Sequence, residues 1–219
     1  MILEDKIVEV FSKKNLVYAN AERVHNISLP NETREFILKI GFPHIVDHFR
    51  FSMDFEPISE DIQIGESARR HLGQLHTIGY ESASQVIGRM IFLSEIGLDN
   101  NASLSDIGRK VRILGVDEYF LFNSEVALSS RICLNLENKG EIVSINPSNL
   151  SIIFFNSSIQ QLAASIVAYG KNLLLVKNFE EEIEDFKQEL KIIDPKALDS
   201  EENVWVDTLE RLIRDDEGY

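Results

Sequence analysis

The chain has 219 residues, 44% hydrophobic and 26% charged, which is typical of a globular protein and excludes a disordered or fibrous one. A formal net charge of −14 argues against direct nucleic-acid binding, because proteins that hold phosphate usually carry a basic surface. The single cysteine, Cys133, excludes an internal disulfide and a multi-cysteine zinc site.

The first residues, MILEDKIVEVF, do not have the pattern of a secretory signal, because Glu4 and Asp5 stand where positive charge is expected. A lone cysteine also fits a reducing compartment, so we expect a cytoplasmic protein. Residues 142–170 carry no charge and are long enough to span a bilayer, but the Asn, Ser and Gln side chains spread through them would be costly in hydrocarbon. We therefore expect no membrane partner.

Two helices are predicted near the start of the chain. The stretch LPNETREFILKIGFP predicts the second, because Pro30 suits a first helical turn and Gly41 followed by Pro43 is a typical end. The first, over residues 2–14, is indicated by apolar side chains at helical spacing: Leu3, Ile7, Val10 and Phe11.

A strand that ends at Pro57 is predicted next, because apolar side chains at Phe49, Phe51, Met53 and Phe55 alternate with polar ones. Residues 59–115 show the weakest pattern. Segments 89–96 and 111–122 are apolar enough for strands, and GLDNNASLSD between them predicts a loop.

Residues 131–145 predict a β-hairpin. Ile132 and Leu134 alternate with polar residues, ENKGE supplies the turn, and Val143 and Ile145 are expected to resume the buried face. The continuously apolar segment 152–155 favours a central strand covered on both faces.

Three helices are predicted to complete the chain. Ser157 and Gln160 have the spacing of a capping box, so the first is expected to begin there and to pack on the sheet. Two acidic helices follow, one from about Asn178 to Asp194 and one through NVWVDTLERLIRD. Trp205 lies on the apolar stripe of the last helix, where a core position is favoured.

Catalytic motifs are weak throughout. HIVDH places His44 and His48 four residues apart, as in zinc sites on helices, but Ile45 stands where a metalloprotease has Glu. Cys133 has no surrounding nucleophile signature and is expected to pack in the core. GRKVRILG lacks the phosphate-loop and dinucleotide patterns. We predict no catalytic residue, metal ligand or cofactor.

A dense group of carboxylates opens the first acidic helix. It could be a solvated helix face, a cation site, a contact for a basic protein, or a catalytic acid and base pair. Residues 171–219 hold 7 basic against 15 acidic side chains, which supports a basic partner. The predicted contact residues are Glu180, Glu181, Glu182, Glu184 and Asp185.

Three motifs in order carry a resemblance to a known family: LPNETREFILKIGFP, then ICLNLENKGEIVSIN, then FFNSSIQQLAASI. Together they resemble the SUKH superfamily of bacterial immunity proteins, most like its fourth family, over roughly residues 28–170. The resemblance implies an α+β fold with a mixed or antiparallel sheet flanked by helices. We expect a domain over 1–175, with an acidic helical extension over 176–219 packed on it.

The resemblance also implies a function without catalysis. Members are thought to bind and neutralise toxin domains in the bacterial cytoplasm, often nucleases or nucleic-acid deaminases. A basic toxin domain is then the expected partner, met by the acidic surface and inhibited by occlusion. Two alternatives stay open: an unrecognised metal-dependent enzyme built around His44 and His48, and a cytoplasmic scaffold protein with the same fold. The oligomeric state is open as well.

Overall fold

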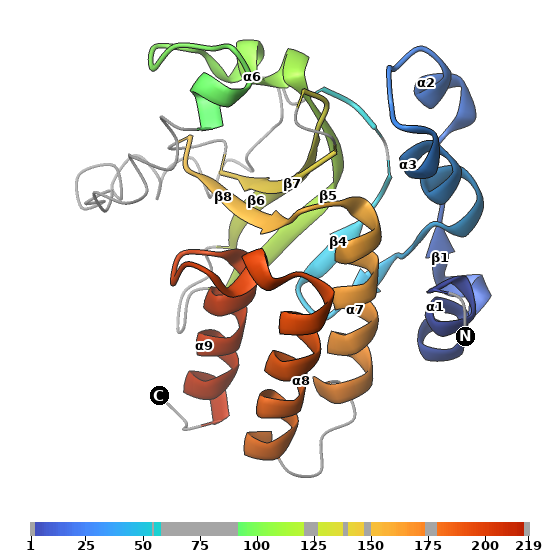
Figure 1. Cartoon of the computed structure of the whole chain (residues 1–219), viewed down its shortest axis with the longest axis vertical. Coiled ribbons are helices and arrows are strands. Elements are labelled where there is room, and N and C mark those ends of the chain that lie inside the picture. Colours follow the sequence, from blue (N-terminus) through green and yellow to red (C-terminus); the bar gives the residue numbers. More distant parts are fainter. Residues whose placement is uncertain are drawn as a thin grey trace.

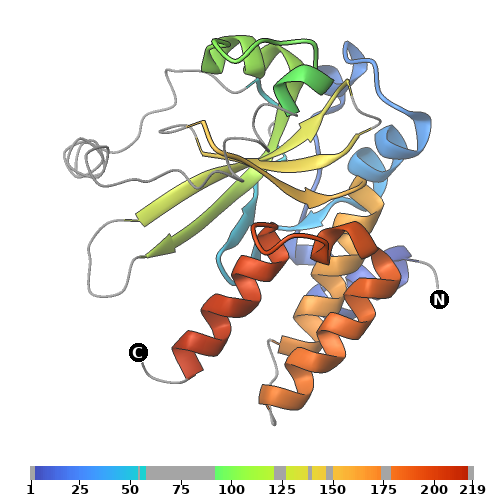
Figure 2. The ribbon, with the colours of Figure 1, turned by 60° about the vertical axis from the view of Figure 1, so that its left-hand side comes forward.

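A computed structural model describes residues 3–53, 55–57, 92–120, 127–137, 140–146, 150–173 and 179–216. These residues form an α+β fold, as expected, in which helices cover a twisted antiparallel sheet (Figures 1 and 2). None of the helices in these ranges is both long and apolar enough to cross a membrane.

The main sheet has six strands that are neighbours in chain order, and every pairing is antiparallel. The strands are β3 (Ile45–Val46), β4 (Phe49–Phe51), β5 (Val111–Phe120), β6 (Ala127–Asn135), β7 (Ile142–Ile145) and β8 (Ile152–Asn156). The hairpin prediction is therefore confirmed as β6 and β7. The central position expected for residues 152–155 is wrong, because β8 comes last in the sheet and pairs with β7.

The helices lie in three places. At the start of the chain come α1 (Leu3–Phe11), α2 (Ala21–His25), α3 (Asn31–Glu35) and a π-helical turn, η2 (Phe36–Ile40). The 3-10 turn η1 (Lys13–Asn15) leads into a small ribbon of β1 (Leu16–Val17) and β2 (Phe42–Pro43). On one side of the sheet lie α7 (Ile159–Leu173), α8 (Phe179–Ile193), the 3-10 turn η3 (Pro195–Leu198) and α9 (Val204–Asp216), and α6 (Leu104–Lys110) lies on the other (Figure 2).

Both faces of the hairpin are buried, each in a different core. Ile132 and Leu134 belong to the larger core with α7, α8 and α9, where Trp205 is fully buried as predicted. Val143 and Ile145 belong to the smaller core beneath α6, on the face of Cys133. The expectation that they share the face of Ile132 is wrong, because the register pairs Val143 with Cys133.

The strand predicted up to Pro57 is shorter in the structure. β4 ends at Phe51, and Met53 and Phe55 adopt positive φ angles of 54° and 61°. Their side chains are nevertheless buried, and their amides donate hydrogen bonds to Leu114 O and Ile113 O of β5. The alternation of apolar and polar residues correctly predicted that these side chains are buried. It could not predict the irregular backbone, because a period of two indicates only a regular strand.

The region before β5 contains helix where strand and loop were predicted. Residues 92–95 form a helical turn, and residues 89–91 of that predicted strand lie outside the described ranges. α6 begins inside the predicted loop, where Ser103 and Asp106 form a capping box. In that box the Ser103 amide donates to Asp106 Oδ2 and the Asp106 amide donates to Ser103 Oγ.

The cap of α7 is displaced by one residue from the prediction. Ser158 caps the helix by accepting a hydrogen bond from the Gln161 amide over 3.2 Å. Ser157 instead donates its hydroxyl to Asp194 Oδ1 over 2.8 Å, and its amide donates to Asp194 Oδ2. Ser157 and Ser158 each have a glutamine three residues later, so the local sequence does not distinguish them. Ser157 is bound to the distant Asp194, which leaves Ser158 as the cap.

Candidate functional site

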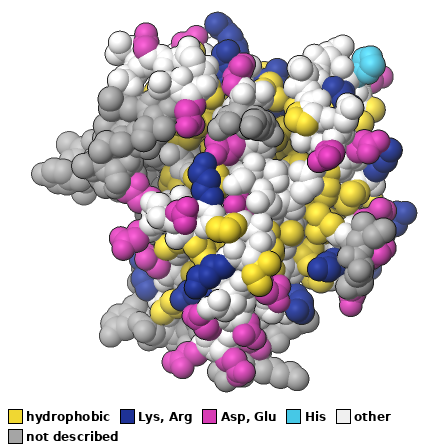
Figure 3. Space-filling view, viewed as in Figure 1, with side chains coloured by type: hydrophobic (Ala, Val, Ile, Leu, Met, Phe, Trp, Pro, Cys, Tyr) yellow, Lys and Arg dark blue, Asp and Glu magenta, His cyan; other side chains and the backbone are white. Residues whose placement is uncertain are grey.

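The predicted acidic contact lies on the outer face of α8. Its core-facing residues, Ile183, Phe186 and Leu190, are buried against α7 and α9. Four of the five predicted carboxylates are exposed, and Glu182 is half-buried. In Figure 3 acidic side chains gather at the lower end of the molecule, where α8 begins (Figure 1). Glu180, Glu181, Glu184 and Asp185 thus lie exposed on this helix, with Glu182 half-buried beside them, and we call these five residues the acidic face.

Two local interactions stabilise carboxylates of the acidic face. Carboxylates in a first helical turn are stabilised by the helix dipole, and Glu180, Glu181 and Glu182 occupy that turn of α8. Glu184 accepts a hydrogen bond from the Gln188 carboxamide over 2.7 Å. Such interactions hold the charges on a regular helix without removing them from the surface.

A buried polar network fixes the far end of α8 to the sheet. Asp194, directly after α8, is 1% exposed and accepts hydrogen bonds from Ser157 and from the Asn156 carboxamide. The Asn156 oxygen in turn accepts from the Trp205 indole over 3.0 Å. The network therefore joins β8, α8 and α9, and it gives the acidic face a fixed position relative to the sheet.

The two histidines of HIVDH are not brought together on a helix. His44 follows β2 and is exposed, whereas His48 lies in the β3–β4 turn, with its ring 12% exposed. No three His, Cys, Asp or Glu side chains of the described ranges are arranged to hold a metal ion. Spacing of four residues brings imidazoles to one face only on a helix, and here the chain is a hairpin.

His48 instead belongs to an ionic cluster that joins four elements, which we define by His48, Asp47, Asp117, Tyr169 and Arg211. His48 Nδ1 lies 2.8 Å from Asp47 Oδ2, which also accepts a hydrogen bond from the Tyr169 hydroxyl over 2.6 Å. His48 Nε2 lies 3.7 Å from Asp117 Oδ1 and 3.4 Å from Arg211 Nη2. The cluster thereby connects the β3–β4 turn, β5, α7 and α9.

The carboxylates of the ionic cluster differ in their electrostatics. The hydrogen bond with His48 is the main cause that lowers the pKa of Asp47 to about 2, and the Tyr169 hydroxyl contributes. Burial raises the pKa of Asp117, against the opposing attraction of His48 and Arg211. Burial, and then the hydrogen bond to Asp47, raises the pKa of Tyr169. Asp117 Oδ1 accepts no hydrogen bond from the described residues.

The ring of His48 is held between protein groups. Nδ1 lies beside Asp47, and Nε2 lies beside Asp117 and Arg211. The members of the ionic cluster are far apart in sequence and belong to no motif, so sequence patterns gave no sign of the cluster. Its geometry fits a structural junction between α9 and the sheet.

Cys133 is confirmed as a core residue. Its side chain is fully buried in the smaller core, and burial raises the pKa of its thiol. The protonated thiol is a poor nucleophile.

Comparison of the chain with models of known protein families, with curated proteins and with solved structures finds no match.

Proposed function

We propose that the chain is an immunity protein that binds a basic bacterial toxin domain, of nuclease or nucleic-acid deaminase type, and neutralises it by occluding its active site. The proposal rests on the ordered resemblance to the SUKH superfamily. The observation that carries the choice of surface is the acidic face of α8, which is exposed while Phe186 and Leu190 anchor the helix in the core.

Charge supplies the physical mechanism of recognition. A chain with a net charge of −14 attracts a basic domain over a Debye length, roughly 10 Å at 0.1 M salt. Because α8 is already packed on the core, little conformational entropy is lost when its carboxylates contact lysines and arginines of a partner. We expect the acidic face to raise the association rate, while apolar contacts around it set the dissociation rate.

Calorimetry and stopped-flow binding to a catalytically inactivated toxin domain encoded beside this gene test the proposal. Tight binding that weakens with salt is expected. Reversing Glu180 and Asp185 to lysine on α8 should slow association about tenfold or more at low salt, with a small effect on dissociation.

A matched control variant shows whether the association rate depends on the position of the reversed charges or only on their number. Reversing Glu22 and Glu32, exposed on α2 and α3, changes the net charge by the same amount. Equal slowing by both variants would show steering by total charge alone and would remove the acidic face from the proposal. Absence of binding to the folded toxin domain would reject that partner.

A further inference from the structure

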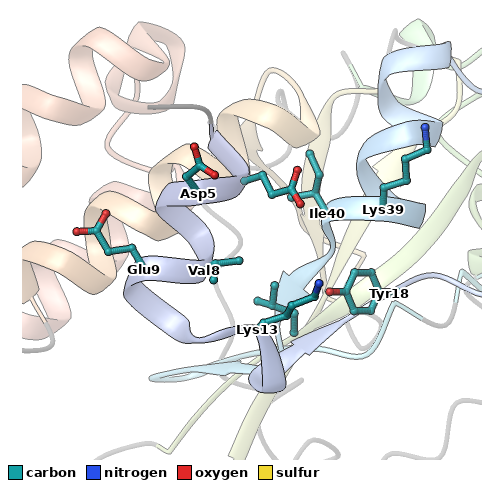
Figure 4. A pocket seen from close by; sticks show the side chains of 9 residues that line it. Asp5, Val8, Glu9, Lys13, Tyr18, Lys39 and Ile40 are labelled. Atoms are coloured by element: carbon teal, nitrogen blue, oxygen red, sulfur yellow. The ribbon is translucent and has the colours of Figure 1, made fainter.

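A hollow of about 430 Å³ lies between α1, η1, β1 and the end of η2, at a distance in sequence from the acidic face. Figure 4 shows it from close by. Its apolar floor includes Val8 and Ile40, and charged side chains of both signs surround it. A volume of this size suits a small ligand or one anchoring side chain, since ligand pockets hold roughly 300 to 1,000 Å³.

Three polar groups around the hollow are not engaged by the described part of the chain. They are the Glu4 carboxylate, the Lys13 ammonium and the Tyr18 hydroxyl, none of which makes a hydrogen bond or ion pair there. Lys39, also in the wall, contacts Glu35 over 3.2 Å and points away from Lys13 in Figure 4. Unpaired groups that converge on an apolar floor are typical of a binding site.

The aromatic wall of the hollow is fixed by a glycine. Gly41 has a φ of 74°, and a Cβ there would overlap Val17 O and come within 3.0 Å of the Tyr18 ring. The Tyr18 ring therefore packs directly against the Gly41 backbone, and 40% of the surface of Tyr18 is exposed. In Figure 4 the ends of Lys13 and Tyr18 point toward one another. Lys13 and Tyr18 together form a donor pair at one end.

The charges are separated along α1. Glu4 lies in the first turn, whereas Lys13 follows the last residue, Phe11, so roughly 10 Å of helix axis separates the two ends at 1.5 Å per residue. The other carboxylates of the wall, Asp5 and Glu9, point away from Lys13 and Tyr18 in Figure 4. The hollow thus has a negative end, an apolar middle and a positive end, and it complements a ligand with the reverse order of charges.

We propose that this hollow binds arginine or lysine with a free α-carboxylate, either as the free amino acid or as the last residue of a peptide. The side-chain cation would face Glu4, the methylene chain would lie on Val8 and Ile40, and the carboxylate would accept hydrogen bonds from Lys13 and Tyr18. An extended basic residue carries its side-chain cation and its carboxylate at opposite ends, as the hollow requires, and the free amino acid adds an α-ammonium beside the carboxylate. This inference is independent of toxin binding.

Calorimetric titration of the full chain with L-arginine tests the proposal. We expect saturable one-to-one binding that weakens about tenfold or more with agmatine, which lacks the carboxylate, and with L-citrulline, which lacks the cation. A short peptide ending in arginine, titrated with a free and with an amidated terminus, distinguishes the two sources. Tighter binding of the free-terminus peptide than of L-arginine would assign a chain end, and binding of L-arginine alone would assign the amino acid.

Variants locate the site within the chain. Lys13→Met and Glu4→Gln should each weaken L-arginine binding about tenfold, and both residues are exposed, so folding should be retained. The matched controls are Lys14→Met and Glu22→Gln, which are exposed and lie outside the hollow. No saturable binding of L-arginine or of either peptide, equal affinity for agmatine, or unchanged binding by Lys13→Met would overturn the proposal.

Discussion

The Trp205 indole donates a hydrogen bond to the Asn156 oxygen over 3.0 Å, so the largest buried side chain of α9 is tied to the last strand of the sheet. The same Asn156 donates to Asp194 over 3.0 Å and to Ser165 over 3.2 Å. One fully buried carboxamide therefore has partners on α7, α9 and the segment after α8.

Asn156→Ala should lower the free energy of unfolding by about 3 kcal/mol, because it leaves the buried Trp205 donor unpaired and opens a small cavity. Urea denaturation measures the change as a lower midpoint at constant slope. Asn101→Ala, at an exposed loop position, is the control and should stay within about 0.5 kcal/mol of the unmodified protein. Equal stability of the two variants would contradict the network.

Arg211→Met should destabilise the protein by about 3 kcal/mol, because Asp117 is 5% exposed and would lose its nearby guanidinium. Adding Asp117→Asn should recover most of that loss by removing the buried charge. Asp117→Asn alone should be close to neutral, since Arg211 keeps Asp207 at 3.2 Å. Thermal and urea unfolding of the three variants measure the coupling, and additive losses would contradict it.

Asp47 should contribute to stability in a pH-dependent way. Its folded pKa of about 2 lies below the usual aspartate pKa of 3.8, so its contribution is present above pH 3.8 and is lost as the pH falls toward 2. Because 41% of the side chain is exposed, we expect about 1 kcal/mol after solvent screening.

Asp47→Asn tests this dependence without backbone strain, because Asn tolerates the φ of 53° at this position. The variant should be less stable at pH 7 and should approach the unmodified protein near pH 2. Exposed Asp199→Asn is the control, for which no such convergence is expected. A constant difference across the acid range would show that the hydrogen bonds of Asp47 do not depend on its charge.

Gly170→Ala should destabilise the protein although alanine favours helix by about 1 kcal/mol. A Cβ on Gly170 would come within 2.5 Å of Phe11 Cζ and 3.0 Å of Val10 Cγ1, so the Phe11 ring, or α1 with it, would have to shift away from α7. We expect a net loss of about 1 to 2 kcal/mol. Phe11→Val in the same chain makes room and should reduce the penalty of the alanine, and a stabilised Gly170→Ala protein would contradict the close packing.

Cys133 should react with a thiol reagent only after the protein unfolds, because it is fully buried and its pKa is raised. Labelling with a chromogenic disulfide should follow the rate of global unfolding in urea. Fast labelling of native protein would show that the smaller core opens locally.

The elements with strong local signals were predictable from sequence. Periodic apolar faces predicted α1 and α8, and Gly41 followed by Pro43 predicted the end of η2, where Gly41 adopts a positive φ. The edge position of β8 and the choice of Ser158 over Ser157 depend on partners distant in sequence, above all Asp194. The local sequence carries no information about such distant contacts.

The same distinction applies to the sites. The exposure of most carboxylates of the acidic face could be predicted, because they lie close together in the sequence and the apolar spacing of α8 shows which side faces outward. The ionic cluster joins residues 47, 48, 117, 169 and 211, and the hollow joins α1 to β1 and η2, so both exist only once the chain is folded.

The η3 turn lies beside β8, where the Lys196 ammonium is 4.3 Å from the centre of the Phe154 ring and 2.6 Å from Glu141. A last strand in a sheet can pair with strands of other molecules, and a lysine held beside it opposes such pairing. We therefore expect Lys196 to oppose self-association through β8, the last strand of the described sheet.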